Sequence, residues 1–274
     1  MAFLRFIPLA YLSWLIGKLA NLPLPQPLAR WSILIFSRLY GVNVDSAAKP
    51  LSEYRSIGDF FTRDLIPEIR PVADGFVSPV DGTLRSVENL VGRDSITQVK
   101  GRSYSLERLL AEDEQVDLLA TGQVWNFYLS PRDAHHIYAP IDGMIIRTVH
   151  IPGKLWPVND WALHSIDGLF AVNERVVTYV RTDRGLVAVV MIGATNVGRI
   201  SLAYMTLETN VAPWSRKTLR AFDHIQGIPV ARGQKIGTFK MGSSVIVVAQ
   251  DTMREMSLPT TPAAVQYGQA LSEL

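Results

Sequence analysis

The dipeptide Gly242-Ser243 lies between two runs of residues that have the character of strands. Before it, residues of different size alternate from Ile236 to Met241, and after it four β-branched residues follow one another. The simplest interpretation is a turn or a bulge, because glycine tolerates backbone angles that other residues resist.

A chemical interpretation of the same dipeptide is also available. The Ser243 hydroxyl can attack the carbonyl of Gly242 and convert the amide into an ester, if a neighbouring base takes its proton. Elimination from that ester would turn Ser243 into dehydroalanine and then into an N-terminal pyruvoyl group. This ketone can form a Schiff base with an amine and accept electrons from a departing carboxylate, as pyridoxal phosphate does elsewhere.

Two aspartates occur in copies of one local pattern, Pro79-Val80-Asp81-Gly82 and Pro140-Ile141-Asp142-Gly143. Asp-Gly between apolar runs predicts a hairpin turn at both places. The residues alone therefore give no preference for Asp81 over Asp142 as a chemical group.

Two adjacent histidines, His135 and His136, follow a predicted turn. In an extended chain they point to opposite sides, which argues against a shared metal ion, and no metal is expected. His136 and Tyr138 would lie on the same side of such a strand.

The chain resembles the phosphatidylserine decarboxylases, pyruvoyl-dependent enzymes that make phosphatidylethanolamine. Their motif Leu-Gly-Ser-Thr corresponds to Met241-Gly242-Ser243-Ser244. Further stretches match the family in order along most of the chain: 54–56, 60–63, 79–82, 128–133, 158–159, 169–171, 173–176, 192–195 and 197–198.

The resemblance implies self-cleavage between Gly242 and Ser243, a pyruvoyl cofactor made from Ser243, and decarboxylation of a phospholipid through a Schiff base. It also implies that the two fragments, β and α, remain associated. The family's charge-relay aspartate falls at Asp81, and its decarboxylation histidine falls at His135.

One family residue is replaced: Tyr138 stands at the position where the family has the second histidine of the relay. A tyrosine hydroxyl has an unperturbed pKa near ~10 and is a poorer general base at neutral pH than a histidine near ~6.5. Three alternatives stay open: His136 completes the relay, His135 serves both steps, or cleavage is slow or absent.

The composition narrows the class of protein. The chain has 274 residues, of which 48% are hydrophobic and 19% charged, so it is long and apolar enough for a sizeable core. A formal net charge of +2 gives no reason to expect nucleic acid as a partner. The absence of cysteine excludes disulfides and thiolate chemistry.

The first 40 residues form two apolar segments separated by three prolines. Arg5 and Lys18 leave only twelve residues between charges, short of the roughly 20 that span a bilayer. A second helix is predicted from Leu28 to Tyr40 and ends at Gly41. These features favour a peripheral anchor on the cytoplasmic side of the cell membrane. A signal peptide beginning with Arg5 and a helical hairpin packed on the protein's own core are the alternatives.

These patterns predict an α+β protein. Residues 1–69 are expected to form a helical, membrane-associating region and connector. Residues 70–274 are expected to form a β-rich catalytic domain with barrel- or sandwich-like sheets, including a hairpin of 175–182 and 186–192.

Two other functions compete with a decarboxylase. The stretch Val230 to Gly237 resembles the turn of biotinyl and lipoyl carrier domains, in which Lys240 would carry the group. A membrane-bound homologue that never matures is the other alternative. A homodimer is an open question in each case.

Overall fold

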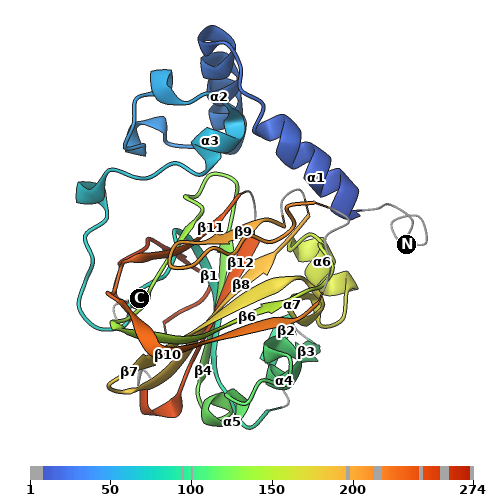
Figure 1. Cartoon of the computed structure of the whole chain (residues 1–274), viewed down its shortest axis with the longest axis vertical. Coiled ribbons are helices and arrows are strands. Elements are labelled where there is room, and N and C mark those ends of the chain that lie inside the picture. The colour runs from blue at the N-terminus through green and yellow to red at the C-terminus, as the bar shows by residue number, and fades with distance from the viewer. Residues whose placement is uncertain are drawn as a thin grey trace.

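The computed structural model of the chain describes residues 9–93, 96–99, 101–195, 198–212, 218–240, 243–253 and 259–271. An open β-sheet forms the body of the molecule, and the N-terminal helices lie beyond one end of its strands (Figure 1). The α+β class is therefore confirmed.

The main sheet has eight strands, and each neighbouring pair is antiparallel. Across the sheet they are β10 (Arg220–Val230), β6 (Gly143–Ile151), β7 (Arg175–Thr182), β8 (Gly185–Gly193), β12 (Ser243–Ala249), β4 (Gln123–Leu129), β1 (Gly82–Asn89) and β13 (Ala263–Val265). Since β10 and β13 are unpaired edges of the described sheet, the sheet is open, and the barrel-like alternative of the prediction was wrong. The hairpin of β7 and β8 is confirmed.

Two smaller sheets complete the strands. One consists of β5 (His136–Tyr138), β11 (Lys235–Phe239) and β9 (Ile200–Leu202), and the other of β2 (Ile96–Val99) and β3 (Arg102–Tyr104). The three-stranded sheet shares a hydrophobic core with one face of the main sheet. The two sheets therefore pack face to face, as in a sandwich, and do not close a barrel.

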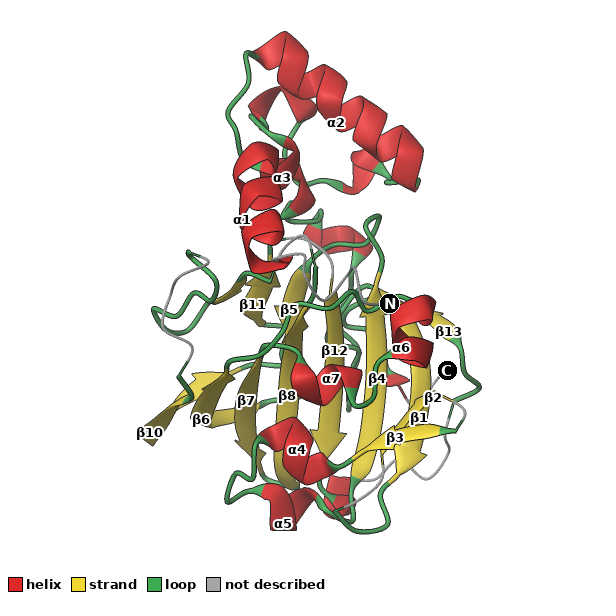
Figure 2. Cartoon of the chain, turned by 90° about the vertical axis from the view of Figure 1, so that its right-hand side faces the viewer, coloured by secondary structure: helices red, strands yellow, loops and turns green. Residues whose placement is uncertain are grey.

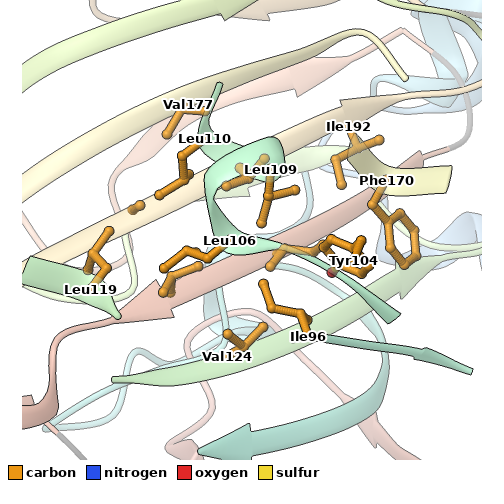
Figure 3. Close-up of a cluster of buried hydrophobic side chains, with 14 of the residues drawn as sticks. Ile96, Tyr104, Leu106, Leu109, Leu110, Leu119, Val124, Phe170, Val177 and Ile192 are labelled. Carbon is orange, nitrogen blue, oxygen red and sulfur yellow. The ribbon is translucent and has the colours of Figure 1, made fainter. Parts of the chain in front are cut away.

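Short helices and the β2–β3 hairpin cover the other face of the main sheet (Figure 2). The helices are α4 (Leu106–Leu110), α5 (Val116–Leu119), α6 (Asp160–Ser165) and α7 (Leu169–Val172). Figure 3 shows Leu106 and Leu109 of α4 among Phe170, Ile192 and Tyr104. Because the central strands are covered on both sides, they read as continuous apolar runs and not as alternating ones.

The N-terminal helices are α1 (Leu9–Ala20), α2 (Gln26–Tyr40) and α3 (Ile57–Phe61), with 3-10 turns at Val44–Ser46, Leu51–Glu53 and Pro67–Ile69. Gly41 ends α2 with a left-handed φ of 70°, as the sequence predicted. Ser56 caps α3 by accepting a hydrogen bond of 3.0 Å from the amide of Asp59. Among the described residues, no helix is long and apolar enough to cross a membrane.

The two Asp-Gly pairs do not form the hairpins that were predicted. Each glycine instead begins a strand, Gly82 in β1 and Gly143 in β6. A Cβ atom at Gly82 would come within 2.4 Å of the Tyr128 carbonyl oxygen, and one at Gly143 within 2.4 Å of the Arg181 carbonyl oxygen. Glycine is needed here because the neighbouring strand approaches closely.

Candidate active site

Ser243 is the first residue of β12, a central strand of the main sheet. It pairs with Leu129 of β4 on one side and with Gly193 of β8 on the other. Gly242 lies outside the described residues, and Ser243 is described by its main chain only. Because β11 belongs to the three-stranded sheet, the chain changes sheets between Phe239 and Ser243.

His135 lies beside this junction and is completely buried. Its carbonyl accepts a hydrogen bond of 2.8 Å from the amide of Phe239, four residues before Ser243. Its Nδ1 lies 2.8 Å from the carbonyl oxygen of Asp133. A carbonyl only accepts, so Nδ1 carries the proton and Nε2 keeps its lone pair. That Nε2 is buried without a hydrogen-bond partner among the described residues.

The environment keeps the His135 ring neutral. Burial lowers the pKa of His135 to about 3, against the opposing effect of the hydrogen bond to Asp133. The ring packs on Phe61 of α3, with 3.9 Å between the ring centroids. The helical region thus supplies the apolar wall that desolvates this histidine.

Both ring nitrogens of His136 lie close to polar side chains. Nδ1 lies 2.9 Å from the hydroxyl oxygen of Thr238, and Nε2 lies 3.2 Å from Asp64, without the alignment of a hydrogen bond. Lys235 also pairs with Asp64. Burial, together with the Lys235 charge, lowers the pKa of His136 to about 4, although the Asp64 carboxylate opposes this. The buried His136 therefore lies at the inner end of a polar network whose carboxylate, Asp64, is 57% exposed.

Tyr138 packs face to face on Tyr267, with ring centroids 3.8 Å apart and planes 11° from parallel. Burial raises the pKa of Tyr138 far above its usual value, and the neighbouring Tyr267 raises it further. The phenol therefore stays protonated at neutral pH.

Asp81 is buried beside this tyrosine pair. Its carboxylate accepts hydrogen bonds from Arg70 Nε (3.0 Å) and Nη2 (2.8 Å), and another of 2.9 Å from the amide of Tyr267. The hydrogen bond to Asp81 raises the pKa of the Arg70 guanidinium. No described hydrogen bond joins Asp81 to His135 or His136, so the predicted contact between the aspartate and a histidine base is not formed in this structure.

The remaining candidate residues occupy other places. Asp142 accepts a hydrogen bond of 2.8 Å from the amide of Arg232, which is a structural role. The Lys240 ammonium lies 2.8 Å from the Glu208 carboxylate. Lys240 is not at a hairpin tip, because β11 and β12 belong to different sheets, so the hairpin that a carrier lysine requires is not formed. The described residues contain no cluster of three or more metal-ligating side chains.

Sequence reasoning missed several of these contacts. No local pattern points to Asp64, whose carboxylate lies 3.2 Å from His136 Nε2, and the sequence around Asp133 predicts only a turn. Arg70 and Tyr267 also gave no local signal: Arg70 is 11 residues from Asp81 in the chain, and Tyr267 is 186 residues from it.

The family model described as phosphatidylserine decarboxylase matches residues 57–273 of the chain. A phosphatidylserine decarboxylase proenzyme of Anaeromyxobacter sp. strain K is 36% identical, over 98% of this chain and 95% of the relative. The proenzyme of Myxococcus xanthus is 37% identical over 90% and 88%, and that of Brevibacillus brevis is 33% identical over 97% and 94%. The chain belongs to the phosphatidylserine decarboxylase family.

Proposed function

We propose that this protein decarboxylates phosphatidylserine to phosphatidylethanolamine, after cleaving itself between Gly242 and Ser243. Family membership supports the reaction. The observation that carries the mechanism is the buried, unpartnered Nε2 of His135, whose main chain is tied to the residues before Ser243.

In the proposed cleavage, His135 Nε2 accepts the hydroxyl proton while Ser243 Oγ bonds to the Gly242 carbonyl carbon. The amide C–N bond then breaks, His135 passes the proton to the Ser243 nitrogen, and an ester joins the two residues. Loss of the Ser243 Cα proton expels the Gly242 carboxylate and leaves dehydroalanine. Addition of water and loss of ammonia complete the pyruvoyl terminus. Because a pKa of about 3 makes His135 a weak base, we expect this single event to be slow.

The pyruvoyl ketone supplies an electron sink for the carbon that loses its carboxylate. The residues of this chain do the rest. The unpartnered Nε2 of His135 can take up the proton that the substrate ammonium group gives up and deliver it to the α-carbon after carbon dioxide leaves, while the ring of Phe61 keeps water away from it.

The fold favours continued association of the fragments. Residues 243–271 would contribute β12, which pairs on both sides, and β13, which pairs with β1. The Tyr267 amide donates to Asp81, and the Leu271 amide donates to the Phe76 carbonyl. Dissociation would expose two strands and the buried apolar side chains they carry.

The outward face of the N-terminal helices supports a peripheral attachment to membranes. On α2 the buried residues are Ala29, Ile33 and Ser37, whereas larger apolar side chains point outward. Those exposed by at least 40% on α2 are Leu28, Trp31, Leu34, Ile35, Leu39 and Tyr40. This arrangement is the reverse of a helix that packs its apolar stripe on its own core.

The cleavage prediction is tested by intact mass. Wild-type protein should give fragments 1–242 and 243–274, the second with a pyruvoyl terminus. Ser243→Ala should remain one chain without decarboxylase activity, because no hydroxyl is left to attack. An active wild-type enzyme with an intact chain would contradict this mechanism.

The assignment of the base is tested on newly made protein. His135→Ala should slow cleavage by about 100-fold or more, which is the usual contribution of a general base. His136→Ala should cleave at close to the wild-type rate, because Nδ1 of His136 faces Thr238 and Nε2 faces Asp64. The reverse order of rates on a time-resolved gel would move the role to His136.

The two aspartates form a matched pair. Asp81→Asn should slow cleavage by roughly tenfold or more, because it weakens charge-assisted bonds to Arg70 and the anchor of Tyr267. Asp142→Asn should leave the rate unchanged.

Tyr138→His should speed cleavage if an imidazole beside Asp81 can act as in the family. If Tyr138→His has no effect and Tyr138→Phe stops cleavage, Tyr138 itself is the working group.

Membrane attachment is tested by flotation with anionic liposomes. Leu39→Asp, at a side chain that is 76% exposed on α2, should weaken binding by about tenfold because an apolar contact with lipid is lost. Leu118→Asp, at a 49% exposed leucine of α5, is the control and should float like wild type. Equal flotation of all three proteins would count against the anchor.

A further inference from the structure

A cavity of about 270 Å³ lies where the segment after α2 meets the β-strand body. Gly41, Asn43 and Ser46 line it from the helical region. Asp133 and Ala134, directly before His135, line it from the other side. The cavity therefore borders both the proposed lipid-facing region and the candidate active site.

Arginines dominate the charge of this cavity. Its lining contains Arg63, Arg70 and Arg132, but only two carboxylates, Asp81 and Asp133. Asp81 is engaged by Arg70 and by the Tyr267 amide. Asp133 accepts two hydrogen bonds of 2.7 Å from the amide and hydroxyl of Ser130 and lies 3.8 Å from Arg132 Nε. One positive charge is left without a dedicated partner.

That charge resides on Arg63. This residue is only 3% exposed, yet Nε and Nη1 have no hydrogen-bond partner among the described residues. Nη2 donates to the Arg132 carbonyl at 2.9 Å, and the guanidinium carbon lies 5.0 Å from the Phe60 ring centre. Burial lowers the pKa of Arg63. A buried guanidinium with two unused donor atoms is costly unless an anion satisfies it.

We propose that this cavity is a binding site for a phosphate group, in which Arg63, Arg70 and Arg132 supply the donors. Guanidinium groups match the oxygens of a phosphate geometrically, and several of them can share one anion. Where the phosphate is that of the lipid headgroup, the inference rests on the proposed function. A free phosphate ion would use the same donors.

The location is consistent with a headgroup subsite. Two residues that line the cavity, Asp133 and Ala134, directly precede His135 in the chain. Another, Gly41, directly follows α2, which carries the exposed apolar face. A lipid whose tails remain in the membrane could therefore place its phosphate in the cavity and its serine toward His135.

The first arm of the test measures binding of inorganic phosphate to the purified full-length protein by isothermal titration calorimetry. Arg63→Gln and Arg132→Gln should each weaken binding by roughly tenfold or more, the value of a lost charged hydrogen bond. Arg132 has a 63% exposed side chain, so its variant should fold even if the buried Arg63 cannot be replaced. The control is Arg93→Gln, which removes a guanidinium paired with Glu107 outside the cavity and should bind as wild type does.

The second arm separates the two sources of phosphate with a soluble short-chain phosphatidylserine. If the headgroup occupies the cavity, inorganic phosphate should compete with this lipid, and Arg132→Gln should raise KM more than it lowers kcat. If free phosphate is the ligand, phosphate should bind equally well with and without saturating lipid. Both results support the anion site.

Failure of the site and failure of the proposed function remain distinguishable. A protein without decarboxylase activity that still loses phosphate binding in Arg132→Gln would retain the anion site and lose the function. An active enzyme that binds no phosphate, or binds it equally in wild type and Arg132→Gln, would overturn the anion site alone.

Discussion

The double pairing of β12 is the constraint on which the rest of the structure depends. All seven residues of this strand are in register with both β4 and β8, and its interior side chains are buried on both faces of the sheet. Ser243 is its first residue, so a cut before Ser243 falls outside this paired region. The strand that carries the proposed reactive terminus can therefore stay in the centre of the core after the chain is broken, held by the same bonds that formed it.

Burial then decides the electrostatics beside this strand. His135 is oriented by a carbonyl, which fixes the tautomer, as an aspartate would, but provides no full negative charge to stabilise an imidazolium. The charged groups nearby are paired with one another: Asp81 pairs with Arg70, and Asp64 pairs with Lys235. The result is a neutral ring with an available lone pair, an arrangement suited to proton movement in a dry site, where a permanent charge would be costly.

Local patterns predicted the parts of the fold that depend on local physics. The β7–β8 hairpin, the Gly41 helix end and the Ser56 cap follow from alternation, glycine geometry and side-chain capping. The prediction of Asp-Gly hairpins was wrong because each glycine allows a neighbouring strand to approach closely and does not form a turn. The site was only half predictable. Resemblance suggested its candidate residues, but the contact of His136 with Thr238 joins positions 102 apart, and no local pattern encodes such a pair.

The helical region has a larger part in the site than an anchor requires. Phe61 covers the His135 ring, Asp64 faces His136, and Arg63 enters the arginine-lined cavity. All three follow or end α3, whose position depends on packing against α2 and α1. The face of α2 that points away from this packing carries the exposed apolar side chains. Deleting residues 1–69 would thus remove walls of the site together with the proposed lipid-facing surface, so attachment and chemistry share one segment of the chain.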